Sequence, residues 1–370
     1  MPSPEPQQPR HLLHVFSTFA VGGPQVRFAM LANLFGARYR HTIIAMDGVY
    51  ACAERLVPSL DVTLAPLPVE KGGGLSIRNL RAFRRALKDI QPDLLVTYNW
   101  GTIEWALANR LRPLSPQVHL EDGFGPEEAN GLLKRRALMR RLALGSRVRV
   151  VVPSRLLERV ATQIWGLSPQ RVTFVPNGVD CARFAATRKD WPLPIPDDAL
   201  IVGSIGALRE EKNLARLIRA MAALPDHVHL VLAGDGPQRP HLQETVAALD
   251  LGSRVHFTGH VTAPEALLGR FDIFAMSSDT EQMPIGLIEA MAAGLPVVAT
   301  DVGDVREMVA QENRALIVPA SDEPALADAL AALARDLERR TRLGAANRHR
   351  AEADYTLERM AAAYDTLFAS

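Results

Sequence analysis

The first half of the chain alternates short apolar runs with longer amphipathic stretches. Short apolar runs bounded by polar turns predict strands that are buried on both faces of a sheet. Between them, residues 25–35 and 76–90 carry apolar positions at the spacing of one helix face. This alternation predicts a mostly parallel sheet with helices on both faces. The predicted strands lie at 11–19, 41–48, 61–68 and 93–100, followed by the runs QVHLEDG and RVRVVVPS.

A polar segment with three prolines, residues 185–198, interrupts the alternation and predicts a linker. After it the pattern restarts with the apolar runs ALIVGSIGAL, HVHLVLAGDGP, RVHFTGHV, DIFAMSS and LPVVATD. At 370 residues the chain is long enough for two domains, which we place at 1–187 and 188–354. The predicted class is therefore α/β, with two doubly wound Rossmann-like domains facing each other across a ligand cleft.

The two halves differ in charge although the whole chain is nearly neutral. Residues 1–185 carry a net charge of +10 and the remainder −9, which together give the formal +1. Opposite charges favour two domains with different partners. The two cysteines, Cys52 and Cys181, lack metal or redox spacing, and no apolar run or leader pattern indicates membrane insertion or export. We therefore expect a cytoplasmic protein.

The most informative segment is SSDTEQMPIGLIEAMAAGLPVVAT, residues 277–300. Glu281 lies in its polar first part, and Glu289 lies on an alanine-rich run that predicts a helix ending at Gly294. The start of that helix, near 282–286, would present unpaired backbone N–H groups, which bind phosphate or diphosphate. Carboxylates on either side accept the hydrogen bonds that hydroxyl groups donate. The segment predicts a site for an anionic, polyhydroxylated ligand.

Glycine loops follow several predicted strands. Gly22 and Gly23 follow the first strand and precede a helix, where they would let a ligand approach the backbone. Gly206 ends the first strand of the second half, and Arg209 and Lys212 follow it in positions suited to a diphosphate. Neither the dinucleotide fingerprint G-x-G-x-x-G nor a P-loop occurs. Their absence argues against a nicotinamide dehydrogenase and a P-loop NTPase.

Further motifs accompany these features along nearly the whole chain. They are PNGVD at 176–180 with Phe184, GDGP at 234–237, and EAMAAGLPVVATDVG from Glu289 onward. Together with the glycine loops, Lys212 and Glu281, they resemble the retaining glycosyltransferases of family 4, which have the two-domain GT-B fold. The stretch DYTLERMAAAYDTLF is similar to that family's last helix. The resemblance implies that residues 355–370 pack back on the first domain.

The resemblance also implies a role for each candidate residue. A nucleotide diphosphate-sugar would bind the second domain, with Lys212 on the diphosphate, Glu289 on the ribose and Glu281 on the donor sugar. Catalysis would then involve Glu281, Lys212 and, from the first domain, His119. The donor-binding set comprises Gly22, Gly23, Arg209, Lys212, Val261, Gln282, Met283, Pro284, Ile285 and Glu289. The candidates for holding the acceptor are Glu121, Asp122 and Asn99, although the two carboxylates would equally suit a helix cap.

The implied reaction transfers a glycosyl group to an acceptor hydroxyl with retention at the anomeric carbon. The chain has no Asp-x-Asp motif, so we expect neither a metal ion nor a cofactor. Cationic side chains and helix amides would stabilise the departing diphosphate instead. We expect UDP ahead of GDP in the donor, because UDP is the more common nucleotide. Two positions depart from the family: Ala207 stands where arginine is common, and Gln282 where glycine is common.

Two basic stretches of the first domain, 78–88 and 134–149, suit an anionic membrane surface because leucine, alanine and methionine lie between their cations. The expected acceptor is a sugar or a lipid-linked sugar in cell-surface polysaccharide or glycolipid synthesis, met by a peripheral protein on the inner face of the membrane. Aromatic residues make up only 6% of the chain, which argues against nucleic acid. Two alternatives stay open, namely a nucleotide-sugar epimerase of GT-B fold and a catalytically inactive partner subunit.

Overall fold

The computed structural model describes residues 8–67, 69, 76–123, 133–145, 147–186 and 191–369. The chain divides into two compact units, the first comprising Met1–Pro176 with Ala361–Ser370 and the second comprising Asn177–Met360. Within the described ranges, no helix is both long enough and apolar enough to cross a membrane.

The second unit begins before the linker that the sequence predicted. Phe184 and Ile195, which lie on either side of the undescribed residues 187–190, are buried in the core of the second unit. Trp191 and Leu193 pack against the same core. The described part of the proline-rich segment is therefore attached to the second unit, because its apolar side chains have a hydrophobic surface to cover.

The first unit is built on a seven-stranded sheet in the order β3-β2-β1-β4-β5-β6-β7. Every neighbouring pair in this sheet is parallel. The order reverses between β1 and β4, which is where open α/β sheets bind ligands. The strands are β1 (Arg10–Phe16), β2 (Tyr39–Ala45), β3 (Val62–Leu64), β4 (Leu94–Tyr98), β5 (Gln117–Leu120), β6 (Arg149–Val152) and β7 (Val172–Phe174).

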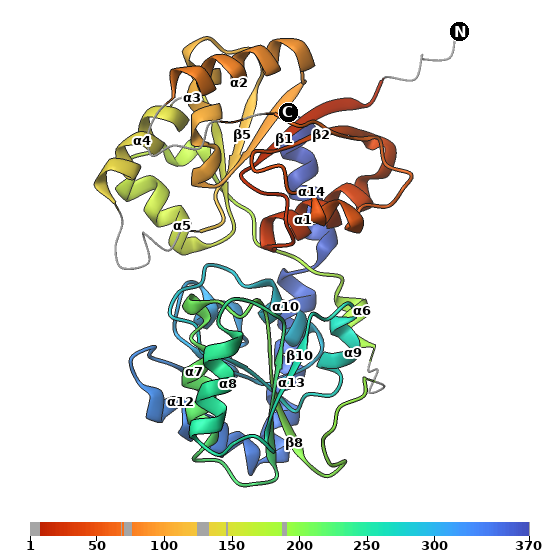
Figure 1. The fold of residues 1–370 in the computed structure, drawn as a ribbon, viewed down its shortest axis with the longest axis vertical. Helices are drawn as coiled ribbons and strands as arrows, with labels where there is room; N and C mark the ends of the chain where they lie inside the picture. The colour runs from red at the N-terminus through yellow and green to blue at the C-terminus, as the bar shows by residue number, and fades with distance from the viewer. Residues whose placement is uncertain are drawn as a thin grey trace. The chain divides into compact units, whose positions relative to one another are not determined.

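Helices cover both faces of this sheet (Figure 1). They are α1 (Gly23–Phe35), α2 (Ile77–Ile90), α3 (Ile103–Leu111), α4 (Lys134–Leu144), α5 (Arg155–Arg159) and α14 (Leu357–Ala369). Phe83 of α2 stacks on Trp105 of α3 with ring centroids 4.4 Å apart, and both belong to the core beneath β1 and β4. The C-terminal part of α14 belongs to this unit, where Tyr39 Oη donates a hydrogen bond of 2.7 Å to the Asp365 carboxylate.

The second unit repeats the design on a six-stranded parallel sheet in the order β10-β9-β8-β11-β12-β13. Its order reverses between β8 and β11. The strands are β8 (Leu200–Ile205), β9 (Val228–Ala233), β10 (Val255–Gly259), β11 (Ile273–Met276), β12 (Val297–Thr300) and β13 (Ile317–Val318). The helices are α6 (Cys181–Ala185), α7 (Leu214–Met221), α8 (Arg239–Ala248), α9 (Pro264–Leu268), α10 (Ile285–Ala292), α11 (Val305–Met308), α12 (Glu323–Ala334) and α13 (Leu337–Asp354).

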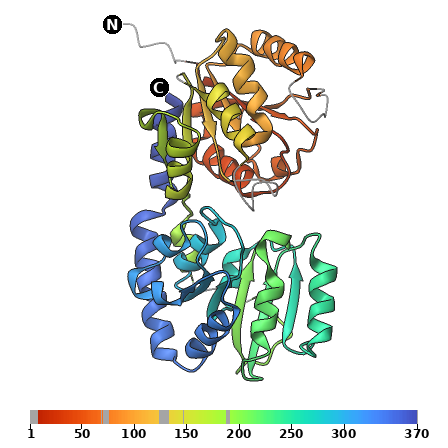
Figure 2. The same ribbon diagram turned by 90° about the vertical axis from the view of Figure 1, so that its left-hand side faces the viewer.

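Successive residues of the strands in the second unit belong to different cores. Ile201 of β8 packs in one cluster with α9 and α10, whereas its neighbours Leu200 and Val202 pack in another with α7, α8 and α12. Side chains alternate across a strand, so this division means that both faces of the sheet are covered (Figure 2). The predicted class, α/β with two doubly wound Rossmann-like sheets, is confirmed.

Three histidines are buried on neighbouring strands of the first sheet. His14 Nε2 lies 3.1 Å from His41 Nδ1, and His14 Nδ1 lies 3.0 Å from the Tyr98 hydroxyl. His11 Nε2 lies 2.8 Å from the hydroxyl of Thr42. Burial is the largest cause that lowers the pKa of all three, to about 4 for His41 and well below 6.5 for His14. The folded protein therefore keeps this cluster neutral.

We expect the free energy of unfolding to fall as the pH drops from above 6.5 to about 4. In this window the unfolded chain binds protons that the folded cluster rejects, and His41 alone accounts for up to about 3 kcal/mol. Urea unfolding at a series of pH values measures the effect. His41→Gln should flatten the dependence, and equal slopes for the two proteins would contradict the assignment.

Candidate active site

The loops after β8, β9 and β10 meet at the carboxyl edge of the second sheet. Gly206 N donates to Ala233 O over 2.9 Å, and Gly234 N donates to Gly259 O over 2.8 Å. Gly234 has a φ of +136°, and a Cβ there would overlap the carbonyl oxygen of Gly206. Glycine at 234 therefore lets two loop backbones touch, which brings the segment after β8 close to its neighbours.

Lys212 and Glu281 form an ion pair at this edge. Lys212 ends the 3-10 turn η7 (Glu210–Lys212) after β8, and Glu281 lies in the loop between β11 and α10. β8 and β11 are the neighbours between which the strand order reverses. The Ser278 hydroxyl also donates to Glu281 Oε1 over 2.8 Å. The Lys212 side chain is 27% exposed and that of Glu281 10%, so a solvated ligand can reach the ammonium group more readily than the carboxylate.

Helix α10 starts beside this ion pair. Its first residue is Ile285, with Pro284 as the N-cap, and no side chain of the described residues caps its first amides. Gly286 would place a Cβ only 3.3 Å from the Ile205 carbonyl, so the helix start lies against the end of β8. Uncapped amides and the positive end of the helix dipole favour an anion here. Glu289 lies one turn further along and is half-buried.

The other residues expected at the donor are placed as follows. Arg209 is more than half exposed and lies 4.0 Å from Glu211, in a surface ion pair. The side chains of Gln282 and Met283 are buried, and the Met283 carbonyl accepts a hydrogen bond of 2.8 Å from Asn177 Nδ2. Val261 follows β10 and packs against the core that α10 helps to form. Their roles toward a donor stay predictions.

In the first unit, Asp122 joins three loops at the carboxyl edge. Arg27 of α1, the helix that begins directly after Gly22, donates to both Asp122 oxygens, with Nη2–Oδ2 at 2.9 Å. The Asp122 amide donates over 2.6 Å to Oδ1 of Asn99, which follows β4 and has a φ of +57°. Asp122 itself follows β5. The ion pair joins the N-terminal part of α1, directly after the glycine loop, to Asp122, and the amide of Asp122 adds the loop after β4 through Asn99.

His119 and Glu121 are enclosed within the first unit. His119 Nδ1 lies 2.9 Å from the Thr97 hydroxyl, and Nε2 lies 3.4 Å from Glu121. Glu121 also receives a hydrogen bond of 3.1 Å from Nε of Arg140 on α4. Although burial raises the pKa of Glu121, the hydrogen bond from His119 and the charge of Arg140 outweigh it and lower the pKa. These side chains and Thr97 have no exposed surface, so the acceptor role of Glu121 and the catalytic role of His119 stay predictions.

Sequence reasoning did not find Arg27, Thr97, Ser278 or the role of Arg140. Arg140 belongs to the basic stretch expected at a membrane surface, yet it is fully buried, because it is paired with Glu121 and enclosed by Trp100 and Trp165. The signal for Arg27 was a single cation in the mostly apolar helical run 25–35. Among the described residues, no group of three His, Cys, Asp or Glu side chains is placed to hold a metal ion.

The chain matches two family descriptions, one in each half. Residues 21–183 match Glycosyltransferase Family 4, and residues 186–350 match Glycosyl transferases group 1. The 2-deoxystreptamine N-acetyl-D-glucosaminyltransferase of Streptomyces fradiae is 30% identical over 363 residues, which cover 88% of this chain and 86% of that protein. The chain belongs to the family 4 glycosyltransferases.

Other relatives of this glycosyltransferase match over shorter stretches. The lipopolysaccharide core biosynthesis glycosyltransferase LpsE of Rhizobium meliloti is 30% identical over 215 residues, or 58% of this chain and 62% of that protein. The matches with three further curated relatives span 36%, 51% and 61% of those proteins. Among solved structures, Anabaena HepE in complex with UDP-glucose has a TM-score of 0.81 at 18% identity, with 97% of this chain and 100% of that chain covered. This likeness confirms the GT-B fold.

We expect Gly234→Ala to destabilise the second unit by about 2 kcal/mol or more, because a side chain there meets both an unfavourable φ and the Gly206 carbonyl. Urea denaturation measures the loss. Gly252→Ala is the matched control, since a Cβ at 252 meets no atom within 4 Å. Equal stability of the two variants would show that the close approach of the two loops is not required.

Proposed function

We propose that this glycosyltransferase moves a sugar from a nucleotide diphosphate-sugar to an acceptor hydroxyl, with retention at the anomeric carbon and without a metal ion. The observation that carries the proposal is the pairing of Lys212 with Glu281 beside the uncapped start of α10. One cation, one carboxylate and the start of a helix that no described side chain caps suit a ligand that combines a diphosphate with hydroxyl groups. HepE, which shares the fold, binds UDP-glucose, and this supports UDP as the nucleotide.

In the proposed complex the donor separates the Lys212–Glu281 pair. The ammonium group turns to the diphosphate, whose charge the backbone N–H groups of Gln282, Met283 and Ile285 also stabilise as it develops. Glu281 accepts a hydrogen bond from a donor-sugar hydroxyl, and Glu289 accepts one from the ribose. Both carboxylates thus position the donor, while Lys212 and the helix amides lower the energy of the departing diphosphate.

In this reaction one bond breaks and one bond forms on the same face of the sugar. The bond from the anomeric carbon to the phosphate oxygen breaks, and the acceptor oxygen bonds to the anomeric carbon from the same side. The acceptor proton passes to the departing phosphate oxygen, which gains negative charge as the bond breaks. No protein carboxylate forms a covalent intermediate in this route.

We propose a sugar or lipid-linked sugar acceptor in cell-surface polysaccharide or glycolipid synthesis. The lipopolysaccharide role in the name of LpsE supports this class of product. Helix α4 of the first unit supports a membrane-bound acceptor, because it exposes Leu138 and Leu142 next to Lys134 and Arg141. Apolar side chains between cations suit a surface of anionic lipid.

Replacing Leu138 and Leu142 together by glutamine should weaken binding to vesicles of anionic lipid by about tenfold, because the apolar contacts of α4 are lost. Co-sedimentation at low and high salt measures this. Leu337→Gln is the control, since Leu337 is 67% exposed but lies in the second unit. Failure of the unaltered protein to bind the vesicles at low salt would rule out the membrane surface.

Thermal shift with UDP, GDP and ADP, followed by transfer assays with the matching donor sugars, tests the proposed function. UDP should stabilise the protein most, and Lys212→Ala should abolish that stabilisation because it removes the cation. Glu281→Gln should keep nucleotide binding yet lower turnover by about a hundredfold or more. Arg219→Ala, which breaks the exposed pair of Arg219 with Glu323 in the same unit, is the control.

Three outcomes would overturn this assignment. Near-normal turnover of both Lys212→Ala and Glu281→Gln would show that neither residue takes part in the transfer. Inversion of the donor sugar without an acceptor would identify an epimerase instead. The absence of stabilisation by any nucleotide would favour an inactive partner subunit.

A further inference from the structure

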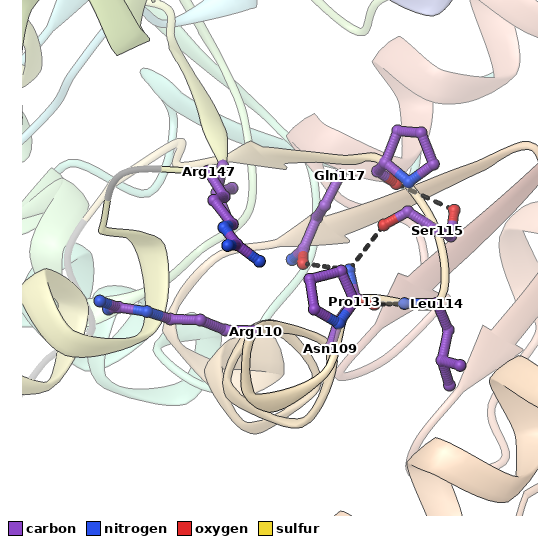
Figure 3. Close-up of a pocket in the computed structure, with 9 residues that line it drawn as sticks. Asn109, Arg110, Pro113, Leu114, Ser115, Gln117 and Arg147 are labelled. Atoms are coloured by element: carbon purple, nitrogen blue, oxygen red, sulfur yellow. Dashed lines mark hydrogen bonds between the residues drawn. The ribbon is translucent and has the colours of Figure 1, made fainter.

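A chain of buried hydrogen bonds runs through the first sheet from its amino edge. At that edge, a pocket of about 400 Å³ is lined in part by Asn109, Gln117 and Arg147 (Figure 3). Asn109 Nδ2 donates to Gln117 Oε1 over 3.1 Å, as the dashed line between them shows. Gln117 Nε2 then donates to the Thr97 hydroxyl oxygen over 3.1 Å, and that hydroxyl lies 2.9 Å from His119 Nδ1. The chain thus connects the pocket floor to the candidate active-site histidine.

The two amide donors of this chain, Asn109 and Gln117, both point toward Thr97 and His119. Since Gln117 donates to the Thr97 oxygen, the single hydrogen of the Thr97 hydroxyl is free to point at His119 Nδ1. A neutral imidazole that accepts at Nδ1 carries its hydrogen on Nε2, which faces the Glu121 carboxylate. If Nδ1 carried a hydrogen instead, the Thr97 hydrogen would have to turn away inside the core. An unmade buried hydrogen bond of this kind is costly.

Two buried charges end the chain. Glu121 receives hydrogen bonds from His119 and Arg140, and none of the three side chains is exposed. The Arg140 guanidinium lies 5.0 Å from the Trp100 ring centre and 4.6 Å from that of Trp165, which excludes water from the pair. A buried ion pair contributes little stability compared with apolar residues of the same size. The presence of this ion pair at the carboxyl end of β5 therefore suits a role in fixing the positions of Glu121 and His119.

The backbone next to Glu121 is held on both sides. Glu121 N donates to Val151 O over 3.0 Å, and Asn99 N donates to Leu120 O over 2.8 Å. The next residue, Asp122, fastens the glycine loop through Arg27. Anchoring the Glu121 side chain thus fixes the loop on which the contacts of Asp122 depend.

We propose that the chain from Gln117 to Arg140 holds His119 as the Nε2–H form and fixes Glu121 and Asp122 directly after β5, which makes Thr97, Glu121 and Arg140 positioning residues of the transfer reaction. The kinetic part of this inference rests on the proposed function. His119 acts inside the protein in this scheme, because both of its ring nitrogens are used by Thr97 and Glu121. In this scheme His119 supports Glu121 and Asp122 without touching the substrate itself.

Nitrogen-15 NMR of histidine-labelled protein tests the tautomer directly. At near-neutral pH the ring of His119 should carry hydrogen on Nε2 and none on Nδ1, with assignment by His119→Gln. Thr97→Val should change this pattern because it removes the hydroxyl, whereas Thr97→Ser keeps the hydroxyl and should preserve it. A hydrogen on Nδ1 of His119 in the unaltered protein would overturn the proposal. So would a His119 ring signal that Thr97→Val leaves unchanged, and both results hold whether or not the protein transfers sugar.

Kinetics test the positioning role. Thr97→Val should lower kcat by up to about a hundredfold with little change in the KM for the donor, because misplaced groups cost turnover before binding. Thr97→Ser should restore most of the rate. Equal loss of kcat in both variants, or a change in KM alone, would contradict positioning. Lack of transfer by the unaltered protein would count against the proposed function, while the NMR result would still decide the tautomer.

Arg140 is tested by a double substitution, since Arg140→Met alone leaves Glu121 buried without its cation and threatens folding. Glu121→Gln combined with Arg140→Met removes both charges and should fold, as judged by urea denaturation. This folded variant should show the same pattern as Thr97→Val, namely an altered His119 ring signal and a lower kcat. An unaltered signal and rate in it would exclude Arg140 and Glu121 as positioning residues.

Discussion

In both units, the place where candidate residues gather is set by the point at which the order of parallel strands reverses. Loops that leave two neighbouring strands in opposite directions at this point open a crevice at the carboxyl edge of the sheet. In the second unit the reversal lies between β8 and β11, and the loops after them supply Lys212 and Glu281. In the first unit it lies between β1 and β4, and the loops after them carry Gly22 and Asn99. The topology explains why residues far apart in sequence gather at one edge.

The two edges treat charge in different ways. In the first unit the pair of Arg140 with Glu121 is fully buried, and in the pair of Arg27 with Asp122 the arginine is only 3% exposed, so each cation would lose its partner only at a high cost. In the second unit Lys212 is partly exposed and its pair with Glu281 can be opened by a competing anion. The first arrangement holds loops still, and the second leaves a cation available to a ligand. This contrast supports a fixed first unit and a donor site on the second.

The sequence predicted the fold class well, because alternation of strand and helix patterns depends on local spacing alone. It did not show β7 and β13, which are three and two residues long. The equally short β3 was predicted because it lies in the longer apolar run 61–68. Glu281 and Lys212 were both candidates, but their ion pair joins residues 69 positions apart, and only the three-dimensional fold brings them together. The burial of Arg140 was hidden because α4 carries cations around most of its circumference. Helical periodicity could not separate the one enclosed arginine from the exposed ones.

The position of Ala207 sharpens the chemistry of the proposed donor site. At position 207, where the family resemblance implies arginine, this chain has the methyl group of alanine, and Arg209 nearby is more than half exposed beside Glu211. A guanidinium that is solvated and partly neutralised contributes little to a buried diphosphate. Lys212 is then the main cation of the site, and a single ammonium group neutralises only part of a diphosphate's charge. The remaining stabilisation falls to the amides at the start of α10, where Gly286 lets the helix approach β8 closely. A Cβ at 286 would lie 3.3 Å from the Ile205 carbonyl, so the helix start or the end of β8 would have to shift by a few tenths of an ångström. In the proposed mechanism, such a shift acts on the second of the two groups that stabilise the departing diphosphate.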